Sequence, residues 1–215
     1  MNHVPMRVIA ASTRPAKMTR RAIAKQQTRE KVLQAARQLF TERGYEGATI
    51  RDIAKAAGMS TGAVFASFAD KSELFGDILT ADHAAMAQAM SQAADGKTTV
   101  ESALLALFKA GYEFHFPQLP LFAAGVAVSW SWSEAAEQRN RESIRPIRDL
   151  ILQQLRAGVE RGELVERYDL RLVAGTLWDV FLRSYRRAVF DGWSSEDLLT
   201  SLGDQIALIL AGVRA

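Results

Sequence analysis

Residues 49–68 read TIRDIAKAAGMSTGAVFASF, and the spacing within this stretch predicts a helix-turn-helix. Ala54 is small enough for a second helix to cross closely, and Gly58 permits the left-handed turn between the helices. Val64, six residues after Gly58, fills the space where the two helices meet. A helical hairpin inside a core is the alternative, but it would usually have longer helices and more apolar surface.

Helical patterns surround this stretch on both sides. Thr49 and Asp52 have the spacing of a capping box that opens the first short helix, and Ser60 can cap the second. Upstream, helical spacing of apolar residues begins at Thr28, and downstream it continues in long segments to the end of the chain. Because no alternating strand pattern occurs in the sequence, we predict an all-α fold.

The charge is divided unevenly along the 215 residues, although the net charge is only +3. Residues 1–76 have 13 Lys and Arg against 6 Asp and Glu, which gives +7, whereas residues 77–215 have 14 against 18, which gives −4. A basic N-terminal part is expected if only that part meets a polyanion, but a solvated basic surface has the same balance. Residues 1–25 contain no acid and two prolines, and we interpret them as a flexible basic arm.

Several classes of protein are disfavoured by what the sequence lacks. There is no cysteine, so neither disulfides nor thiolate metal sites are expected, and the cytoplasm is the natural compartment. The apolar stretch Leu121–Val128 is far shorter than a membrane-spanning helix. His3, His83 and His115 are widely separated, and no phosphate-binding loop or nucleophile motif occurs. We therefore expect no enzyme, no cofactor and no metal, with an all-α enzyme kept as the least favoured alternative.

Residues 28–76 resemble the DNA-binding domain of the TetR family of bacterial transcription regulators. The match in order and spacing rests on Ala35, Ala36, Leu39, Phe40, Gly44, Tyr45, Thr49, Ile53, Ala54, Gly58, Ser60, Gly62, Phe68, Lys71 and Leu74. The resemblance implies three segments: the arm (1–25), a helix-turn-helix DNA-binding domain (26–76) and a helical domain for effector binding and dimerisation (77–215). It also implies a repressor that binds double-stranded operator DNA as a dimer and is released by a small molecule. A helical interaction protein with weakened DNA binding is the alternative.

The second helix of the motif is predicted to enter the major groove, with Val64 and Phe68 facing inward. Arg51 matches a position where the family can place a base-contacting arginine, and a phosphate contact is the alternative. Thr49 and Lys71 are expected to hold the DNA backbone at helix N-termini. The predicted DNA contacts are Thr49, Arg51, Ser60, Thr61, Ala63, Phe65, Ala66, Ser67 and Lys71. At Phe65 the family usually has a tyrosine, whose hydroxyl commonly binds a phosphate.

All four tryptophans lie after residue 76, where the family's effector pocket is expected. An aromatic lining suits a hydrophobic or aromatic effector of unknown identity, whereas plain core packing is the alternative for each residue. The predicted effector contacts are Met86, Met90, Phe108, Tyr112, His115, Trp130, Trp178, Phe181 and Tyr185.

The last two helices are expected at Asp169–Phe190 and Ser194–Val213, and both have broad apolar stripes. By resemblance they pair with a second subunit, so that two recognition helices face an inverted-repeat operator. Leu202 and Ile206 are the positions predicted to lie in this interface. The alternative is that the stripes are buried within one subunit.

Overall fold

The computed structural model describes residues 19–215, and in this part of the chain all the extended elements are helices, with no strand. The prediction of an all-α fold is therefore confirmed. The helices are α1 (Arg20–Gly47), α2 (Ile50–Ala56), α3 (Thr61–Phe65), α4 (Lys71–Ala94), α5 (Val100–His115), η1 (Phe116–Gln118), α6 (Leu119–Ser129), α7 (Glu134–Glu160), α8 (Leu170–Asp191) and α9 (Ser195–Ala211). None of the helices in this part of the chain is long and apolar enough to cross a membrane.

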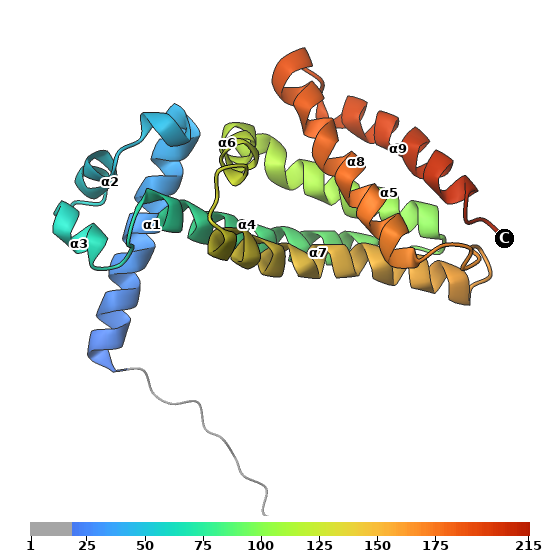
Figure 1. Cartoon of the computed structure of the whole chain (residues 1–215), viewed down its shortest axis with the longest axis horizontal. Helices are drawn as coiled ribbons and strands as arrows, with labels where there is room; N and C mark the ends of the chain where they lie inside the picture. Colours follow the sequence, from blue (N-terminus) through green and yellow to red (C-terminus); the bar gives the residue numbers. More distant parts are fainter. Residues whose placement is uncertain (1–18) are drawn as a thin grey trace, which may run out of the picture.

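The helices form two groups that are joined by α4. Figure 1 shows α1, α2 and α3 together at one end of the molecule, with the C-terminus at the other end. From α3 the chain enters α4, which runs beside α7 into the second group. In that group α5 packs against α4 and α9, and α8 packs against α7 and α9.

Each group has its own hydrophobic core. The N-terminal cluster consists of the buried residues Val32, Ala35, Ala36, Leu39, Phe40, Ala48, Ile53, Ala54, Val64, Phe68, Leu74, Phe75, Ile78, Leu79 and Leu121. The C-terminal cluster consists of the buried apolar residues of α5, α7, α8 and α9, together with those of α4 from Met86 onward, Leu164 and Val213. Both clusters therefore use α4, whose first half belongs to one and whose second half belongs to the other.

Helix α6 packs against the N-terminal cluster although it belongs to the second half of the chain. Leu121 is fully part of that cluster, and Ala124 and Val128 pack against it from the same helix. Gly125 lets α6 approach α4 closely, because a Cβ at this position would lie 3.2 Å from the side chain of Leu79. Helix α6 thus packs against α1 and also touches α4 at Leu79.

A polar cluster joins the same three elements beside this apolar contact. Arg37 of α1 forms an ion pair with Asp82 of α4, and its Nη1 also donates to Gln118 Oε1 at 2.9 Å, directly before α6. Asp82 is only 8% exposed. Burial raises the pKa of the Asp82 carboxyl, and the hydrogen bond and charge of Arg37 oppose this effect. Arg37 therefore compensates a buried carboxylate and connects α1 to α4 and α6.

The first helix begins earlier than the sequence pattern predicted. It begins at Arg20, where the Thr19 hydroxyl accepts a hydrogen bond from the backbone N–H of Ala22, rather than at Thr28. The prediction of a flexible arm is thus wrong for residues 20–25, and residues 1–18 lie outside the described part. These early turns are largely exposed and rich in good helix formers, so they show no apolar periodicity.

Replacing Arg37 by Met is expected to lower the free energy of unfolding by about 1–3 kcal/mol, because it leaves the Asp82 carboxylate buried without its partner. The value is below that for a fully buried pair because the Arg37 side chain remains 35% exposed. Urea denaturation measures the change. Arg145→Met on the exposed side of α7 is the control, and an equal loss in both variants would contradict the assigned role.

Candidate functional site

The helix-turn-helix is built by local signals that the sequence already displays. The Thr49 hydroxyl accepts a hydrogen bond from the Asp52 N–H at 3.2 Å, and the Asp52 carboxylate accepts from the Thr49 N–H, which completes the predicted capping box. Gly58 has φ +68°, the left-handed conformation that ends α2 and starts the turn. Ser60 caps α3 by accepting from the Ala63 N–H at 3.2 Å. These local interactions hold α3 against α2.

Helix α3 has one buried side and one exposed side. Val64 and Phe68 are buried in the N-terminal cluster, as predicted from their spacing. On the opposite side Thr61 and Ala66 are exposed, and the ring of Phe65 is 54% exposed. The outward surface consists of Thr61, Ala63, Phe65, Ala66 and Ser67, of which Ala63 and Ser67 are half-buried.

Arg29 of α1 binds the backbone just after the C-terminal end of α3. Its Nη1 donates to the Ser67 carbonyl oxygen at 2.6 Å, and its Nη2 forms an ion pair with Asp77 of α4. The guanidinium carbon also lies 4.1 Å from the centre of the Phe68 ring. Arg29 therefore connects three elements: α1, the short segment that follows α3, and α4.

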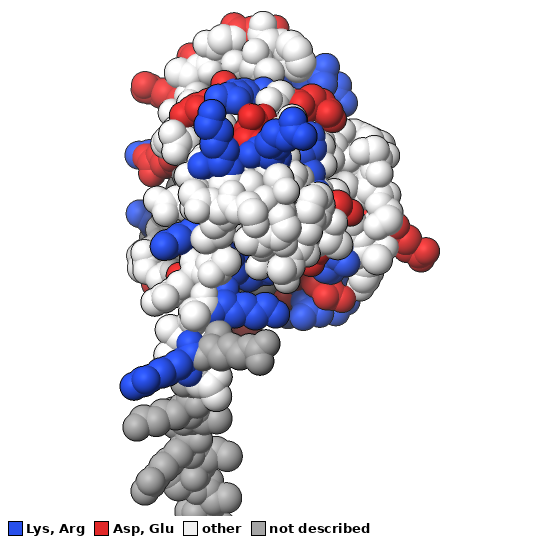
Figure 2. Space-filling model, turned by 90° about the vertical axis from the view of Figure 1, so that its left-hand side faces the viewer, with Lys and Arg blue, Asp and Glu red and all other residues white. Residues whose placement is uncertain are grey.

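The exposed face around α3 combines an uncharged centre with basic surroundings. Residues 56–69 contain no charged side chain, whereas Arg43, Arg51 and Lys55 are exposed on α1 and α2. Figure 2 shows this end of the molecule, with a broad uncharged area and basic side chains on either side of it. Such a surface is suited to a polyanion, whose backbone meets the basic side chains while an uncharged helix lies between them.

Three predicted contact residues already have intramolecular partners. The Thr49 hydroxyl donates to Asp52 Oδ2 at 2.6 Å, so its single proton is used within the capping box. Lys71 Nζ donates to the Tyr45 carbonyl oxygen at 2.9 Å and lies 4.1 Å from the centre of the Tyr45 ring. The Ser60 hydroxyl accepts a hydrogen bond from the Ala63 N–H at the start of α3, and its own proton is still available for donation. Thr49 and Lys71 therefore stabilise this domain, whatever else they contact.

The second group of helices forms a cavity of about 250 Å³ that is open to solvent on one side. Its wall comes from α4, α5, α6, α7, α8 and the segment after α6, and none of the lining residues is charged. Of the predicted effector contacts, Met86, His115, Trp130 and Trp178 line the cavity. Trp130 is 91% exposed, so it lies at the rim rather than inside.

The other five predicted effector contacts lie in the C-terminal cluster and do not line the cavity. They are Met90, Phe108, Tyr112, Phe181 and Tyr185. Phe181 lies at the centre of this aromatic group, with its ring centre 4.9 Å from those of Phe108 and Tyr112. A Cβ at Gly111 would lie 2.7 Å from the Phe181 ring, so no space remains there for a ligand. For these residues core packing, the alternative reading, describes the structure.

The cavity also contains residues that the prediction did not include, chiefly His83 on α4 and Asn140 and Ile144 on α7. A signal for His83 was present, because Leu79, His83 and Met86 are spaced i, i+4 and i+7 and therefore share one face of a helix. No comparable signal existed for α7, since its approach to α8 is a matter of tertiary packing.

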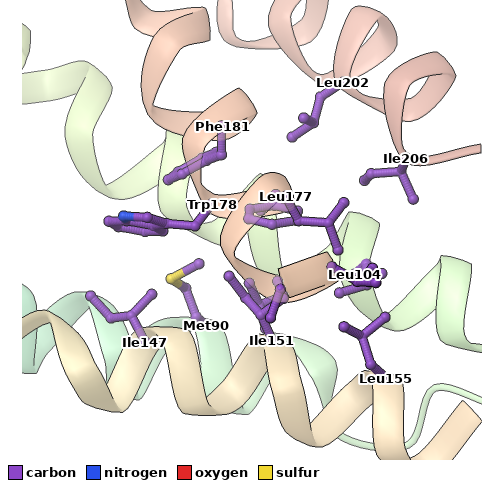
Figure 3. Close-up of a cluster of buried hydrophobic side chains, with 14 of the residues drawn as sticks. Met90, Leu104, Ile147, Ile151, Leu155, Leu177, Trp178, Phe181, Leu202 and Ile206 are labelled. Atoms are coloured by element: carbon purple, nitrogen blue, oxygen red, sulfur yellow. The ribbon is translucent and has the colours of Figure 1, made fainter. Parts of the chain in front are cut away.

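The stripe on α9 faces inward within one chain. Leu198, Leu202, Ile206 and Leu210 are buried in the C-terminal cluster. Figure 3 shows Leu202 and Ile206 pointing from α9 toward Leu177 of α8. The prediction that Leu202 and Ile206 lie in a subunit interface is therefore wrong, because α9 needs this face to cover α5 and α8. The exposed apolar side chains of these two helices are instead Leu172, Val189, Phe190 and Leu208.

Two histidines are the most unusual polar groups of the cavity wall. Burial lowers the pKa of His83 to about 4. Burial lowers the pKa of His115 to about 3, with a smaller contribution from the charge of His83. Both imidazoles are thus neutral at pH 7. In residues 19–215 no group of three or more His, Cys, Asp or Glu side chains is arranged to hold a metal ion.

An exposed helix-turn-helix on one group of helices and a cavity within the other define a DNA-binding transcription regulator. The family described as "Bacterial regulatory proteins, tetR family" matches residues 32–78. Over 178 residues the chain is 32% identical to the HTH-type transcriptional repressor AcnR of Corynebacterium diphtheriae, covering 82% of this chain and 83% of that protein. The chain belongs to the TetR family.

Other similarities cover a shorter part of the chain or extend only to the fold. AcnR of Corynebacterium efficiens is 45% identical over 65 residues, and this match spans 30% of the chain and only 35% of that protein. Among solved structures, FadR of Bacillus subtilis in complex with stearoyl-CoA superimposes with a TM-score of 0.73 at 18% identity, covering 86% of this chain and 99% of FadR. The TetR-family regulator PfmR of Thermus thermophilus gives a TM-score of 0.64 at 23% identity, with coverage of 84% and 97%. These structures share the fold.

The two histidines predict how stability depends on pH. Unfolded histidines bind protons below about pH 6.5, whereas the folded ones remain neutral until about pH 4 and pH 3. The unfolded state therefore binds more protons in this range. The contribution of the two histidines to the free energy of unfolding is fully present above pH 6.5 and is lost as the pH decreases. Between pH 7.5 and pH 5 each histidine is expected to lower the free energy of unfolding by about 1–2 kcal/mol.

Urea denaturation at several pH values measures this dependence, and the variant with both His83→Gln and His115→Gln is the control. The carboxylates are the same in both proteins, so the difference between the two curves isolates the histidines. Equal pH dependence in the two proteins would show that the imidazoles are not held neutral by the fold.

Proposed function

We propose that this protein is a repressor that binds an inverted-repeat operator as a dimer and is released when a small, largely uncharged molecule enters the cavity. The observation that carries the proposal is the position of α6. One side of α6 packs on the N-terminal cluster through Leu121 and Val128, and the other side lines the cavity through Phe122 and Val126. A ligand that displaces α6 therefore acts directly on the domain that contains the helix-turn-helix.

Repression is supported by the relatives. The AcnR proteins of two Corynebacterium species and KstR2 of Mycobacterium tuberculosis are named transcriptional repressors. Binding of a small molecule is supported by FadR, whose structure was solved with stearoyl-CoA and which has the same fold. We assign the DNA-binding domain to residues 26–76 and the effector and dimerisation domain to residues 77–215, with α4 and α6 in contact with both.

For DNA binding we propose that α3 enters the major groove with its outward surface toward the bases. Thr61 and Ser67 supply hydroxyl groups, whereas Ala63, Phe65 and Ala66 offer only apolar contacts, for example to a thymine methyl group. Arg51 on α2 is the exposed side chain beside α3 that can pair with guanine. Ser60, Thr49 and Lys71 lie at helix N-termini and are assigned to the DNA backbone. Lys71 has a second role in the domain itself.

The signal from the cavity has two routes to the DNA-binding domain. The first is α6, which lies against α1. The second is α4, which carries His83 and Met86 on the cavity wall and Leu74 and Phe75 in the N-terminal cluster. Arg37 connects both helices to α1 through Asp82 and Gln118. Because two recognition helices of a dimer must match one groove spacing, a small rotation of each domain lowers operator affinity.

The operator itself is the first test of this function. Selection of bound DNA from a random pool is expected to yield an inverted repeat whose half-sites are one helical turn apart, about 34–36 Å centre to centre. Recovery of no enriched sequence, or of a single half-site without symmetry, would contradict a dimeric repressor.

Arg51→Ala is expected to change the preferred base at one position of each half-site by about 1–3 kcal/mol, because a bidentate arginine–guanine pair is lost. The selected operator and its single-base variants measure this in a gel-shift titration. Arg156→Ala on the exposed side of α7 is the matched control and should leave every affinity unchanged. A uniform weakening on all sequences by Arg51→Ala would mean that Arg51 contacts phosphate instead.

The dimer is proposed to form through the outer surface of α8 and α9. Leu172 is 64% exposed and Leu208 is 75% exposed, so neither belongs to the core of one chain. Charged substitution at Leu208 is expected to give folded monomers, since the new charge would be desolvated in the interface. Sedimentation gives the mass and circular dichroism the helix content. Leu202→Glu is the contrast, expected to unfold the chain because Leu202 lies in the C-terminal cluster. A Leu208→Glu protein that stays dimeric would place the interface elsewhere.

A further inference from the structure

The hydrogen-bond partners around the His115 ring favour one of its two neutral tautomers. Nδ1 of His115 lies 2.9 Å from Tyr185 Oη, and that hydroxyl donates its only proton to the Gly111 carbonyl oxygen at 3.1 Å. With its proton on the Gly111 carbonyl oxygen, Tyr185 accepts from His115, and this arrangement places the proton of the neutral ring on Nδ1. The Nε2 atom of His115 is left with a lone pair and no proton.

His83 is fixed in the same way by a different hydroxyl group. Its Nδ1 lies 2.8 Å from Ser143 Oγ, which donates its proton to the Asn140 carbonyl oxygen at 2.8 Å. In this arrangement Ser143 accepts from Nδ1 of His83. The two imidazoles thus have the same tautomer, set by hydroxyl groups on α7 and α8.

Neither Nε2 atom is fully buried without a partner. Among the described residues no hydrogen bond to either atom is present, and no fully buried side-chain nitrogen or oxygen lacks a partner. The two atoms are therefore not sealed within the protein, and both histidines are among the residues that line the cavity. The remaining wall is largely apolar and includes Phe122, Trp132 and Trp178.

We propose that the cavity selects molecules with an aromatic body and two hydrogen-bond donors, whose O–H or N–H groups are accepted by Nε2 of His83 and Nε2 of His115. The inference rests on the proposed function in taking this cavity as the effector site. It adds the chemical class of the effector, a neutral diphenol or a similar two-donor aromatic compound. A buried acceptor left without a donor is costly, so a ligand without donors is disfavoured.

Two other classes of ligand fit the wall less well. A carboxylate would bring its own lone pairs toward two nitrogen lone pairs, and no Lys or Arg lines the cavity to balance its charge. A metal ion would find two imidazoles but no third His, Cys, Asp or Glu ligand in the part of the chain that the structure describes. Neutral donors remain the class that satisfies both Nε2 atoms.

The tautomers can be tested without any ligand. Long-range proton–nitrogen NMR spectra of the full chain at pH 7 distinguish a protonated from an unprotonated ring nitrogen. We expect the resonances of His83 and His115 to show the proton on Nδ1 in both rings, with His83→Gln and His115→Gln used to assign them. A proton on Nε2 of either ring overturns the inference, because that nitrogen would then be a donor.

Ligand selectivity is tested with 3,3′- and 4,4′-dihydroxybiphenyl, which differ in the separation of their hydroxyl groups. Each is compared with its dimethyl ether and with the matching biphenyl dicarboxylate, and binding is followed by quenching of tryptophan fluorescence in the absence of DNA. At least one diphenol is expected to bind roughly 10-fold or more tightly than its ether and its dicarboxylate, at about 2- to 10-fold for each hydrogen bond. Ethers or dicarboxylates that bind as tightly, or equal lack of binding by all compounds, overturn the inference.

Ser143→Ala separates the role of the tautomer from that of cavity shape. It removes the hydroxyl group that holds the proton on Nδ1 of His83, while the His83 ring and the cavity wall remain. The preference for the diphenol over its ether is expected to fall about 2- to 10-fold, with the affinity of the ether unchanged. Thr80→Ala, a hydroxyl deletion on the same helix as His83 but at an exposed position, is the control. An unchanged ratio in Ser143→Ala overturns the role given to Ser143.

Failure of this inference can be distinguished from failure of the proposed function. Adding the bound diphenol to the protein–operator complex tests release of DNA, which the inference does not require. Selective diphenol binding without release contradicts the proposed function and leaves the inference standing. Release by an effector that has no donor, together with equal binding of diphenol and ether, contradicts the inference and leaves the proposed function standing.

Discussion

The contact of α6 with α1 and α4 determines how the two halves of the molecule are related. Leu121 is buried among residues of the first 79 positions, although it lies some 40 residues further along the chain. Gly125 allows this contact, since a side chain there would meet Leu79. Because packed interfaces have few alternative arrangements, the proposed displacement of α6 by a ligand would move α1 as a unit rather than being absorbed locally.

The polar cluster of Arg37, Asp82 and Gln118 adds directional hydrogen bonds to this apolar contact. Burial disfavours the Asp82 carboxylate, and Arg37 is the cation that compensates for it. The same guanidinium also donates to Gln118, directly before α6. The group that neutralises Asp82 of α4 therefore also holds the start of α6. A buried ion pair of this kind contributes little net stability but is costly to break, which restricts how α1 can move relative to both helices.

The parts of the fold that depend on local interactions were predictable from the sequence. The capping box at Thr49 and Asp52, the left-handed Gly58 and the inward spacing of Val64 and Phe68 need only residues within about ten positions of one another. The start of α1 at Arg20 was missed because its first turns have helix propensity without an apolar face.

The cavity and the exposed surface of the last helices were less predictable, because aromatic residues have the same appearance in a core and in a pocket. Phe181 and Trp178 lie three residues apart on α8 and both belong to the C-terminal cluster, yet only Trp178 also lines the cavity. The stripe on α9 was equally ambiguous, since a wide apolar face is consistent with burial against the same chain or against a second one. Only the packing of α9 on α5 and α8 decides between these possibilities for Leu202 and Ile206.

The two histidines illustrate why the chemistry of the cavity depends on residues that do not line it. Tyr185 has its ring in the C-terminal cluster, but its hydroxyl group decides which nitrogen of His115 carries the proton. If Tyr185 had instead accepted a proton from another group, its own proton would have been available to His115, and Nε2 would be a donor. The polarity presented to a ligand is thus set by a backbone carbonyl oxygen of α5, one hydrogen bond further away. Because α5 packs against α4, movement of α4 can alter the cavity as readily as a ligand in the cavity can move α4, as linkage between the two sites requires.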